Sequence, residues 1–212
     1  MSMIKVIIGI SGGSCSGKTW LANQIKSIRP QEVTIFDLDS YYKPQEYVSS
    51  LQYRHDNPEA INFELAIEQF RLLKNGEEIT IPIYDFETHQ IKGEKIIQPN
   101  PLIIVEGIFA FSHSWFKEQM DLKVWIDAKQ EKCLARRIDR DIKQRGRSKE
   151  EVMHRYSRDV TPAYDNYIYP NRQDSDLFFE NNNDDHQATK MMELILKYLN
   201  QNGVLLPKDS EF

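Results

Sequence analysis

Five short apolar segments alternate along the chain with segments whose apolar residues recur at helical spacing. Continuous apolar runs of this length are typical of strands that are covered on both faces of a parallel sheet. Strands that alternate with helices are joined by right-handed crossovers. We therefore predict an α/β fold built on a doubly wound, five-stranded parallel sheet. Its strands are expected near residues 3–10, 33–37, 102–106, 123–127 and 176–180.

Helix-stopping residues delimit most of the helical segments. Pro30, Gly76 and Gly203 follow three of them, and Gly146 interrupts a fourth. Two further prolines, Pro162 and Pro170, predict an irregular path before the last strand. The predicted helices cover residues 18–28, 63–75, 112–119, 129–147, 149–156 and 186–200.

Residues 79–97 break the alternation of strands and helices. Two extended, β-branched runs predict an inserted β-hairpin, at about residues 79–98. A hairpin between the second and third core strands can form a lid or a substrate wall at the carboxyl edge of the sheet. Tyr84 and His89 lie at its bend. Taken alone, Tyr84 is interpreted as a packing ring and His89 as a solvated turn residue.

Composition restricts the class of protein. The chain has 212 residues, which predicts one domain, 1–212. Its net charge of −5 argues against a nucleic-acid-binding surface, since such surfaces are basic. No apolar run reaches the length of a bilayer span, and the N-terminus runs directly into the first strand, so we expect neither a membrane segment nor a signal peptide. Only Cys15 and Cys133 are present, which fits a reducing cytoplasm.

A phosphate-binding motif separates the first strand from the first helix. Gly12, Gly17, Lys18 and Thr19 fill the pattern G-x-x-x-x-G-K-[ST] of a P-loop. In such a loop the backbone N–H groups and the helix dipole hold phosphates, the lysine reaches the β- and γ-phosphates, and the hydroxyl binds Mg²⁺. We predict nucleoside triphosphate binding. The alternative is a structural glycine turn with an exposed lysine.

Two acids follow predicted strands, where ligands of open α/β sheets bind. Glu106 ends the apolar run 102–106 and matches the Walker-B arrangement that holds Mg²⁺. Burying a charged carboxylate there without a metal would cost free energy, so we predict that Glu106 is a metal ligand. Asp39 follows the second strand, and its position alone fits a metal-side carboxylate and a turn-forming residue equally well.

Basic residues are dense in the predicted helix 129–147. They could form a solvated face paired with Glu131, Asp139 and Asp141, or an arginine lid that closes on the transferring phosphate. The spacing of Arg137, Arg140 and Arg147 places them on one side if the helix persists. The basic set consists of Arg136, Arg137, Arg140, Lys143, Arg145 and Arg147.

Taken together, these motifs resemble the uridine kinase (uridine–cytidine kinase) family of P-loop kinases, from Ile7 to about Leu199. The likeness rests on GISGGSCSGKT, DLDSYY, HDNPEAINFEL, IPIYDFETH, IIVEGIFAF and RRIDRDIKQRGRS, followed by Tyr156 and Thr161-Pro162. It implies transfer of the γ-phosphate of ATP (or GTP) to the 5′-hydroxyl of uridine or cytidine in pyrimidine salvage. It also implies small-molecule partners only, a lid at about residues 136–150, and a cytoplasmic homotetramer inhibited by CTP.

The resemblance implies a role for each matching residue. Asp39 would be the general base, assisted by Lys18, Arg140 and Arg145. Mg²⁺ would be held by Thr19, Asp39 and Glu106. The triphosphate would be bound by Gly12, Gly13, Ser14, Cys15, Ser16, Gly17, Lys18, Thr19 and Arg137. The nucleoside would be bound by Tyr42, Asp56, Tyr84, His89, Arg140 and Arg147. In this set Asp56 holds ribose hydroxyls, and the pair Tyr84 and His89 recognises the pyrimidine, which reverses the interpretation of His89 taken alone.

Four residues depart from the family pattern. Cys15 replaces a small residue in the loop and is expected to react with thiol reagents unless ATP protects it. Trp20 follows Thr19, and its ring is expected to pack under the loop. His55 stands where phenylalanine is frequent and Arg155 where glutamine is common, so the acceptor preference stays open.

Other functions are compatible with the P-loop. A kinase for another riboside, or a phosphoribulokinase-like enzyme, would share the phosphoryl-transfer residues. Tyr84 and His89 weigh against a sugar phosphate, because such a substrate has no base to be held by rings. A nucleotide-dependent switch is a further alternative, although the chain lacks the N-K-x-D guanine signature.

Overall fold

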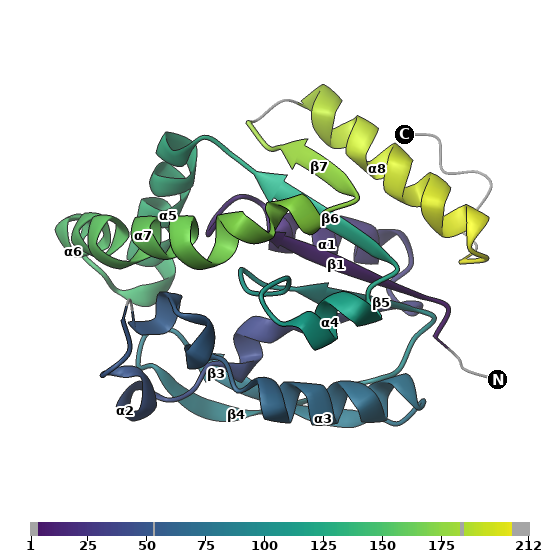
Figure 1. Ribbon diagram of the computed structural model, residues 1–212, viewed down its shortest axis with the longest axis horizontal. Helices are drawn as coiled ribbons and strands as arrows, with labels where there is room; N and C mark the ends of the chain where they lie inside the picture. The colour runs from purple at the N-terminus through teal and green to yellow at the C-terminus, as the bar shows by residue number, and fades with distance from the viewer. Residues whose placement is uncertain (1–3, 53, 183–184, 205–212) are drawn as a thin grey trace.

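A five-stranded parallel sheet crosses the centre of the molecule. The computed structural model describes residues 4–52, 54–182 and 185–204. The strand order is β2-β5-β1-β6-β7, which confirms the predicted doubly wound sheet (Figure 1). The strands are β1 (Val6–Gly12), β2 (Val33–Asp37), β5 (Leu102–Glu106), β6 (Leu122–Asp127) and β7 (Leu177–Glu180).

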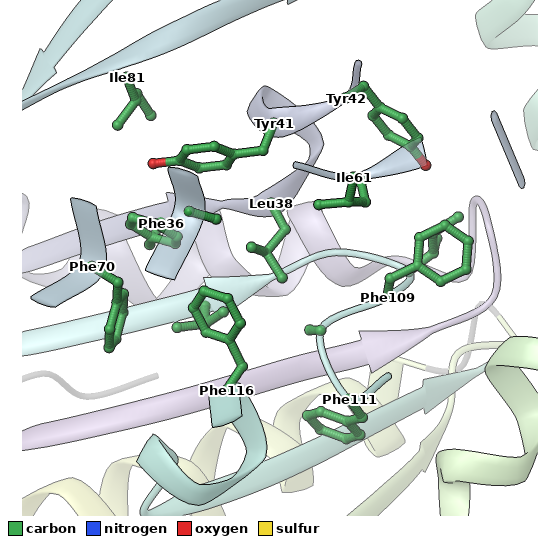
Figure 2. Packing of buried hydrophobic residues seen from close by; sticks show 14 of the residues in the cluster. Phe36, Leu38, Tyr41, Tyr42, Ile61, Phe70, Ile81, Phe109, Phe111 and Phe116 are labelled. Carbon is green, nitrogen blue, oxygen red and sulfur yellow. The ribbon is translucent and has the colours of Figure 1, made fainter. Parts of the chain in front are cut away.

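Both faces of this sheet are covered by apolar side chains. On one face α1 (Lys18–Ile28) and α8 (Asp185–Gln201) pack against alternate strand residues such as Ile8 and Ile104. On the other face lies an aromatic cluster that includes Phe36, Phe70 and Phe116 (Figure 2). Burial on both faces explains why the strands have no polar alternation. The second cluster is contributed by the strands together with α3 (Phe63–Lys74) and α4 (Ser114–Gln119).

The inserted segment is a hairpin, as predicted. Strands β3 (Ile79–Asp85) and β4 (Gln90–Ile97) pair antiparallel in a sheet of their own. The inner side of β3 is buried, whereas most of β4 is exposed. Short helical turns over Leu38–Tyr41, Arg54–Asp56 and Pro58–Ala60, together with α2 (Gln45–Val48), lie between β2 and α3 in the chain.

The chain beyond β6 is more helical than predicted. Helix α5 (Gln130–Arg145) ends at Gly146, whose φ of 60° only glycine adopts easily, and α6 (Lys149–Arg155) follows. The expectation of an irregular path around Pro162 is wrong. The backbone continues through wide, π-type turns at Tyr156–Val160 and Tyr164–Ile168. Such turns shift the hydrogen-bond pattern and accommodate the missing N–H of a proline, here at the start of α7 (Thr161–Ala163).

Tight helical turns over Tyr169–Asp174 then lead to β7. Within the described ranges, the structure contains no helix that is both long enough and apolar enough to cross a bilayer.

Candidate active site

The loop between β1 and α1 has the backbone that the glycine pattern requires. Gly12 and Gly17 adopt φ values of 144° and 117°. A Cβ atom at Gly12 would lie 1.9 Å from the carbonyl oxygen of Ile126, so no larger residue fits. Lys18 is buried, and its Nζ donates to the carbonyl of Gly13 at 2.8 Å. The alternative of an exposed lysine on a structural turn is therefore wrong.

Two side chains from later in the sequence hold this loop from outside. The guanidinium of Arg136 donates to the carbonyl of Cys15 at 3.2 Å, and Asn181 Nδ2 donates to the carbonyl of Ser16 at 2.8 Å. Arg136 also donates to the carbonyl of Asn181 at 3.1 Å. Sequence reasoning missed Asn181. Its only signal is its position directly after β7, at the carboxyl edge of the sheet.

Three carboxylates gather beside the loop. Asp37 and Glu106 are paired residues of the neighbouring strands β2 and β5, and Asp39 donates its backbone N–H to Asp37 Oδ1 at 2.8 Å. Burial, followed by repulsion from Asp39, raises the pKa of Glu106 to about 7. Burial also raises the pKa of Asp39, although Lys18 opposes it, and raises that of Asp37 further. Sequence reasoning also missed Asp37, which is the final residue of its strand.

These groups have the chemistry of a magnesium site. Thr19 Oγ1 donates to Glu106 Oε1 at 2.9 Å, so a hydroxyl and a carboxylate meet at the foot of the P-loop. Hard oxygen ligands of this kind suit Mg²⁺. In the part of the chain that the structure describes, no three His, Cys, Asp or Glu side chains form a complete metal cage. Mg²⁺ does not need one, because one or two carboxylates and substrate phosphates complete its shell.

Four arginines surround one buried carboxylate on the lid side. Arg140 and Arg147 each approach Asp141 within 2.8 Å, Arg145 within 3.3 Å and Arg137 within 3.7 Å. Burial raises the pKa of Asp141, but Arg140 and its neighbours outweigh burial and hold it below the usual range. Because one negative charge faces four positive ones, the cluster keeps a net positive charge.

The interpretation as a solvated face paired with acids therefore applies to only part of the basic segment. Lys143 pairs with Asp139 at 2.6 Å on a solvated face, as the first interpretation expected. The arginines form the cluster around Asp141 instead. Arg147 belongs to that cluster although it lies beyond the end of α5, so a shared helix face is not what unites it with Arg137.

One cavity is lined jointly by the P-loop, by Asp39 and by the arginine cluster. Toward the P-loop it is lined by Asp39, Arg140 and Ser14, whose Oγ accepts from Arg137 at 2.9 Å. The structure thus brings nine of the eighteen predicted site residues to the lining of this cavity, whereas Tyr84, Glu106 and the P-loop residues other than Ser14 are not part of it. The lining includes the predicted residues Ser14, Asp39, Tyr42, Asp56, His89, Arg137, Arg140, Arg145 and Arg147.

Aromatic rings form the other end of the cavity. His55 and His89 stack with ring centroids 4.1 Å apart, and Arg145 lies 4.2 Å above the centre of the Phe86 ring. Tyr84 packs behind Phe86, with centroids 5.0 Å apart. His89 is partly buried in this cluster, so its interpretation as a solvated turn residue is wrong. Arg147 joins this wall to the arginine cluster by donating to the carbonyl of Phe86 at 3.0 Å.

Comparisons with known proteins identify the family. Residues 7–188 match the phosphoribulokinase / uridine kinase family. A uridine kinase from Staphylococcus haemolyticus (strain JCSC1435) is 35% identical over 201 residues, which cover 90% of this chain and 97% of that protein.

The chain belongs to the phosphoribulokinase / uridine kinase family.

Two solved structures share the fold at lower identity. A putative fructose transport system kinase from Silicibacter sp. TM1040 superposes with a TM-score of 0.67 at 20% identity, covering 82% of this chain and 89% of that one. A possible uridine kinase from Bacillus stearothermophilus gives 0.63 at 22% identity, covering 84% and 90%. These likenesses agree with the doubly wound kinase fold.

Residues that depart from the family pattern take up distinct positions in the structure. Trp20 is 45% exposed, so the expectation that it packs under the loop is wrong. The buried side of α1 is formed by Leu21, Ala22 and Ile25, and residue 20 lies outside that stripe. Cys15 has a φ of 62°, which is uncommon for any residue except glycine. His55 and Arg155 both line the cavity.

Proposed function

We propose that this protein transfers the γ-phosphate of ATP (or GTP) to the 5′-hydroxyl of uridine or cytidine and so forms UMP or CMP. The observation that carries the proposal is the shape of one cavity. A buried carboxylate and arginines beside a P-loop lie at one end, and a wall of aromatic rings lies at the other. A nucleoside has its reacting hydroxyl and its planar base at opposite ends, so this cavity suits it.

Asp39 is the proposed general base. Its burial raises its pKa, while Lys18, Arg145 and Arg140 favour the ionised form. A carboxylate with a raised pKa is a stronger base, and the neighbouring cations favour the ionised form that would accept the hydroxyl proton. Its role is to orient the 5′-hydroxyl toward the γ-phosphate and to take its proton.

The cationic groups would stabilise the charge of the transferring phosphoryl group. Lys18 would exchange its contact with the Gly13 carbonyl for phosphate oxygens, and Arg140 and Arg145 would face the same group from the lid. The P-loop N–H groups of residues 12–19 and Arg137 would hold the triphosphate. Mg²⁺, held by Thr19, Asp39 and Glu106, would neutralise the negative charge of the phosphates.

The acceptor side would bind the nucleoside through residues that line the cavity, supported by Tyr84 behind them. Asp56 is proposed to accept hydrogen bonds from ribose hydroxyls, with Tyr42 beside it. Burial raises the pKa of Asp56, and Arg137 opposes this, so a nearby cation favours its ionised form. Arg147, Tyr84 and His89 complete the wall against which the base would lie.

The experiment measures ADP release with Mg·ATP, and GDP release with Mg·GTP, against separate acceptors. The acceptors are uridine, cytidine, adenosine, guanosine and ribulose 5-phosphate, with an acceptor-free control. Turnover with pyrimidine ribosides alone is expected. Turnover with ribulose 5-phosphate or a purine riboside would replace the acceptor assignment and retain a kinase. Hydrolysis that no acceptor accelerates would favour a nucleotide-dependent switch.

Three further properties belong to the same proposal by family resemblance. We expect a cytoplasmic homotetramer that acts in pyrimidine salvage and is inhibited by CTP. Light scattering coupled to gel filtration would measure the oligomer, and a CTP titration at fixed uridine and ATP would measure inhibition. A monomer, or unchanged turnover with CTP, would remove the corresponding expectation.

A further inference from the structure

Two neutral imidazole rings close the acceptor end of the cavity. His55 comes from the turn Arg54–Asp56 and His89 from the hairpin bend, and their planes are inclined by only 17°. Burial and neighbouring cations lower the pKa of His55 to about 4 and that of His89 to about 3. Both rings are therefore uncharged near pH 7, and each carries one N–H donor and one acceptor nitrogen.

Protein groups use both ring nitrogens of His89. Its Nε2 lies 3.3 Å from Arg147 Nη2, and a guanidinium can only donate, so Nε2 accepts and the ring proton is on Nδ1. Nδ1 lies 3.2 Å from the Tyr84 hydroxyl and donates to it. His89 and Tyr84 thus fix each other, and protein groups engage both ring nitrogens of His89 in this structure.

His55 differs from its stacked neighbour. Its Nε2 is buried and has no hydrogen-bond partner among the residues that the structure describes. Its ring lines the cavity. A buried polar atom without a partner requires an explanation, because such atoms are rare in native proteins. No protein contact at Nε2 fixes the tautomer, so this nitrogen can either donate or accept.

The position of His55 along the cavity indicates what it would meet. The ring of His55 stacks on His89 and lies 6.4 Å from that of Tyr84, among the aromatic side chains, whereas Asp39 hydrogen-bonds to Asp37 beside Glu106. The two residues therefore lie toward different ends of the cavity. A nucleoside with its 5′-hydroxyl at Asp39 would direct the base edge farthest from the sugar toward His55. That edge carries an acceptor oxygen in uracil and an amino donor in cytosine.

We propose that His55 hydrogen-bonds the 4-substituent of the pyrimidine and determines which acceptors are used. This inference rests on the proposed function and deepens it. An imidazole that can donate or accept would take uridine and cytidine alike. A phenylalanine ring at this position could stack but could not read the base edge.

The test compares uridine and cytidine with a pyrimidin-2-one riboside, which lacks any 4-substituent. For the wild-type protein, kcat/KM should be about tenfold higher with uridine than with the unsubstituted riboside, the scale of one hydrogen bond. In His55→Phe this ratio should fall to about one. In His55→Asn, which retains a donor and an acceptor, most of the discrimination should remain. The differences should appear in KM, because the Asp39 end is unchanged.

Exposed His154 in α6 supplies the matched control, since His154→Phe should keep the wild-type ratio. A tenfold preference that survives in His55→Phe would overturn the inference. Should that variant not fold, equal wild-type kcat/KM with uridine and the unsubstituted riboside would overturn it without any variant. Absence of turnover with every pyrimidine riboside would instead reject the proposed function itself.

Discussion

Asn181 donates from its side-chain amide to the carbonyl of Ser16 at 2.8 Å and so joins the end of β7 to the P-loop. The contact is close, since a Cβ atom at Gly17 would lie 2.2 Å from Asn181 Nδ2. Arg136 reinforces the same loop from α5. The backbone that is proposed to hold phosphates is thus fixed by residues that follow it by more than a hundred positions.

Replacement of Asn181 should weaken nucleotide binding. Asn181→Ala removes one hydrogen bond from the loop, which corresponds to about 1 kcal/mol and about a fivefold rise in KM for ATP. KM for the nucleoside should stay within about twofold. Steady-state kinetics would measure both constants. Asn202→Ala, which removes an exposed bond to Tyr198, is the control. Equal changes for ATP and nucleoside would contradict a local effect.

Removal of a phosphate-side charge should slow turnover without unfolding the protein. We expect Lys18→Ala or Asp39→Asn to lower kcat by at least ~10², the scale of one electrostatic or acid–base contribution. Asp139→Asn on the exposed face of α5 should leave kcat unchanged. Circular dichroism would establish that each variant is folded. Near-normal turnover in a folded Lys18 or Asp39 variant would reject the proposed roles.

Stability should depend on pH through Glu106. Burial and the nearby Asp39 raise its pKa from the ordinary value of 4.5 to about 7, so between these values the folded state binds more protons than the unfolded state. The free energy of unfolding therefore falls as pH rises from about 4.5 to 7, by about 1 to 3 kcal/mol. Denaturant titrations at pH 5 and pH 8, in EDTA, would measure this loss.

Glu106→Gln should flatten that pH dependence, since the amide does not titrate and still accepts from Thr19. Asp37 and Asp39 have raised pKa values too, so part of the slope should remain. Added Mg²⁺ should reduce the loss in the wild-type protein more than in the variant. An unchanged slope in Glu106→Gln would show that other groups dominate the titration.

The carboxylate of Asp141 should be important for folding. Asp141→Asn leaves four neighbouring arginines without their counter-charge, and loss of a buried partner of this kind costs about 3 to 5 kcal/mol. Urea denaturation would measure the difference. The exposed variant Asp139→Asn should change stability by less than about 0.5 kcal/mol. A loss equally small for Asp141→Asn would mean that the arginines are adequately solvated.

Cys15 should be the reactive thiol of this chain. Cys15 is partly exposed in the P-loop, whereas Cys133 is buried and burial raises its pKa to about 11. Iodoacetamide should therefore inactivate the enzyme, and Mg·ATP should protect it. Cys15→Ser should remain active and resist the reagent, with Cys133→Ser as the sensitive control. Full activity after stoichiometric alkylation of Cys15 would contradict this expectation.

Local signals account for what the sequence predicts correctly. The strand 102–106 and the helix 18–28 have the predicted bounds. The apolar run that predicts the strand and the proline that ends the helix are both local features of the sequence. The P-loop and the acid at Glu106 follow from the same kind of pattern. The predictions for Trp20 and for the turns around Pro162 are wrong. Burial on one side of α1 and the widening of turns around a proline depend on what packs nearby.

The features that the sequence did not predict arise from contacts between distant segments. Nothing adjacent to Asn181 indicates that it meets Ser16, and Asp141 differs from Asp139 only by which side of α5 packs inward. The pairing of His89 with Tyr84 and Arg147 likewise needs the hairpin and the lid in place. Contacts of this kind decide which histidine ring nitrogens are engaged by protein groups, and no sequence motif predicts them.

The bond from Arg147 to residue 86 is made to a main-chain oxygen. The side chain at position 86 can therefore change while this attachment of the hairpin to the lid is kept. The contact of Arg145 with the Phe86 ring does depend on that side chain, so the hairpin is held by one bond that tolerates changes at residue 86 and by one contact that does not. Diversification of acceptor choice among descendants of such a protein could proceed by changes at the bend, without rebuilding the phosphate-handling half of the molecule.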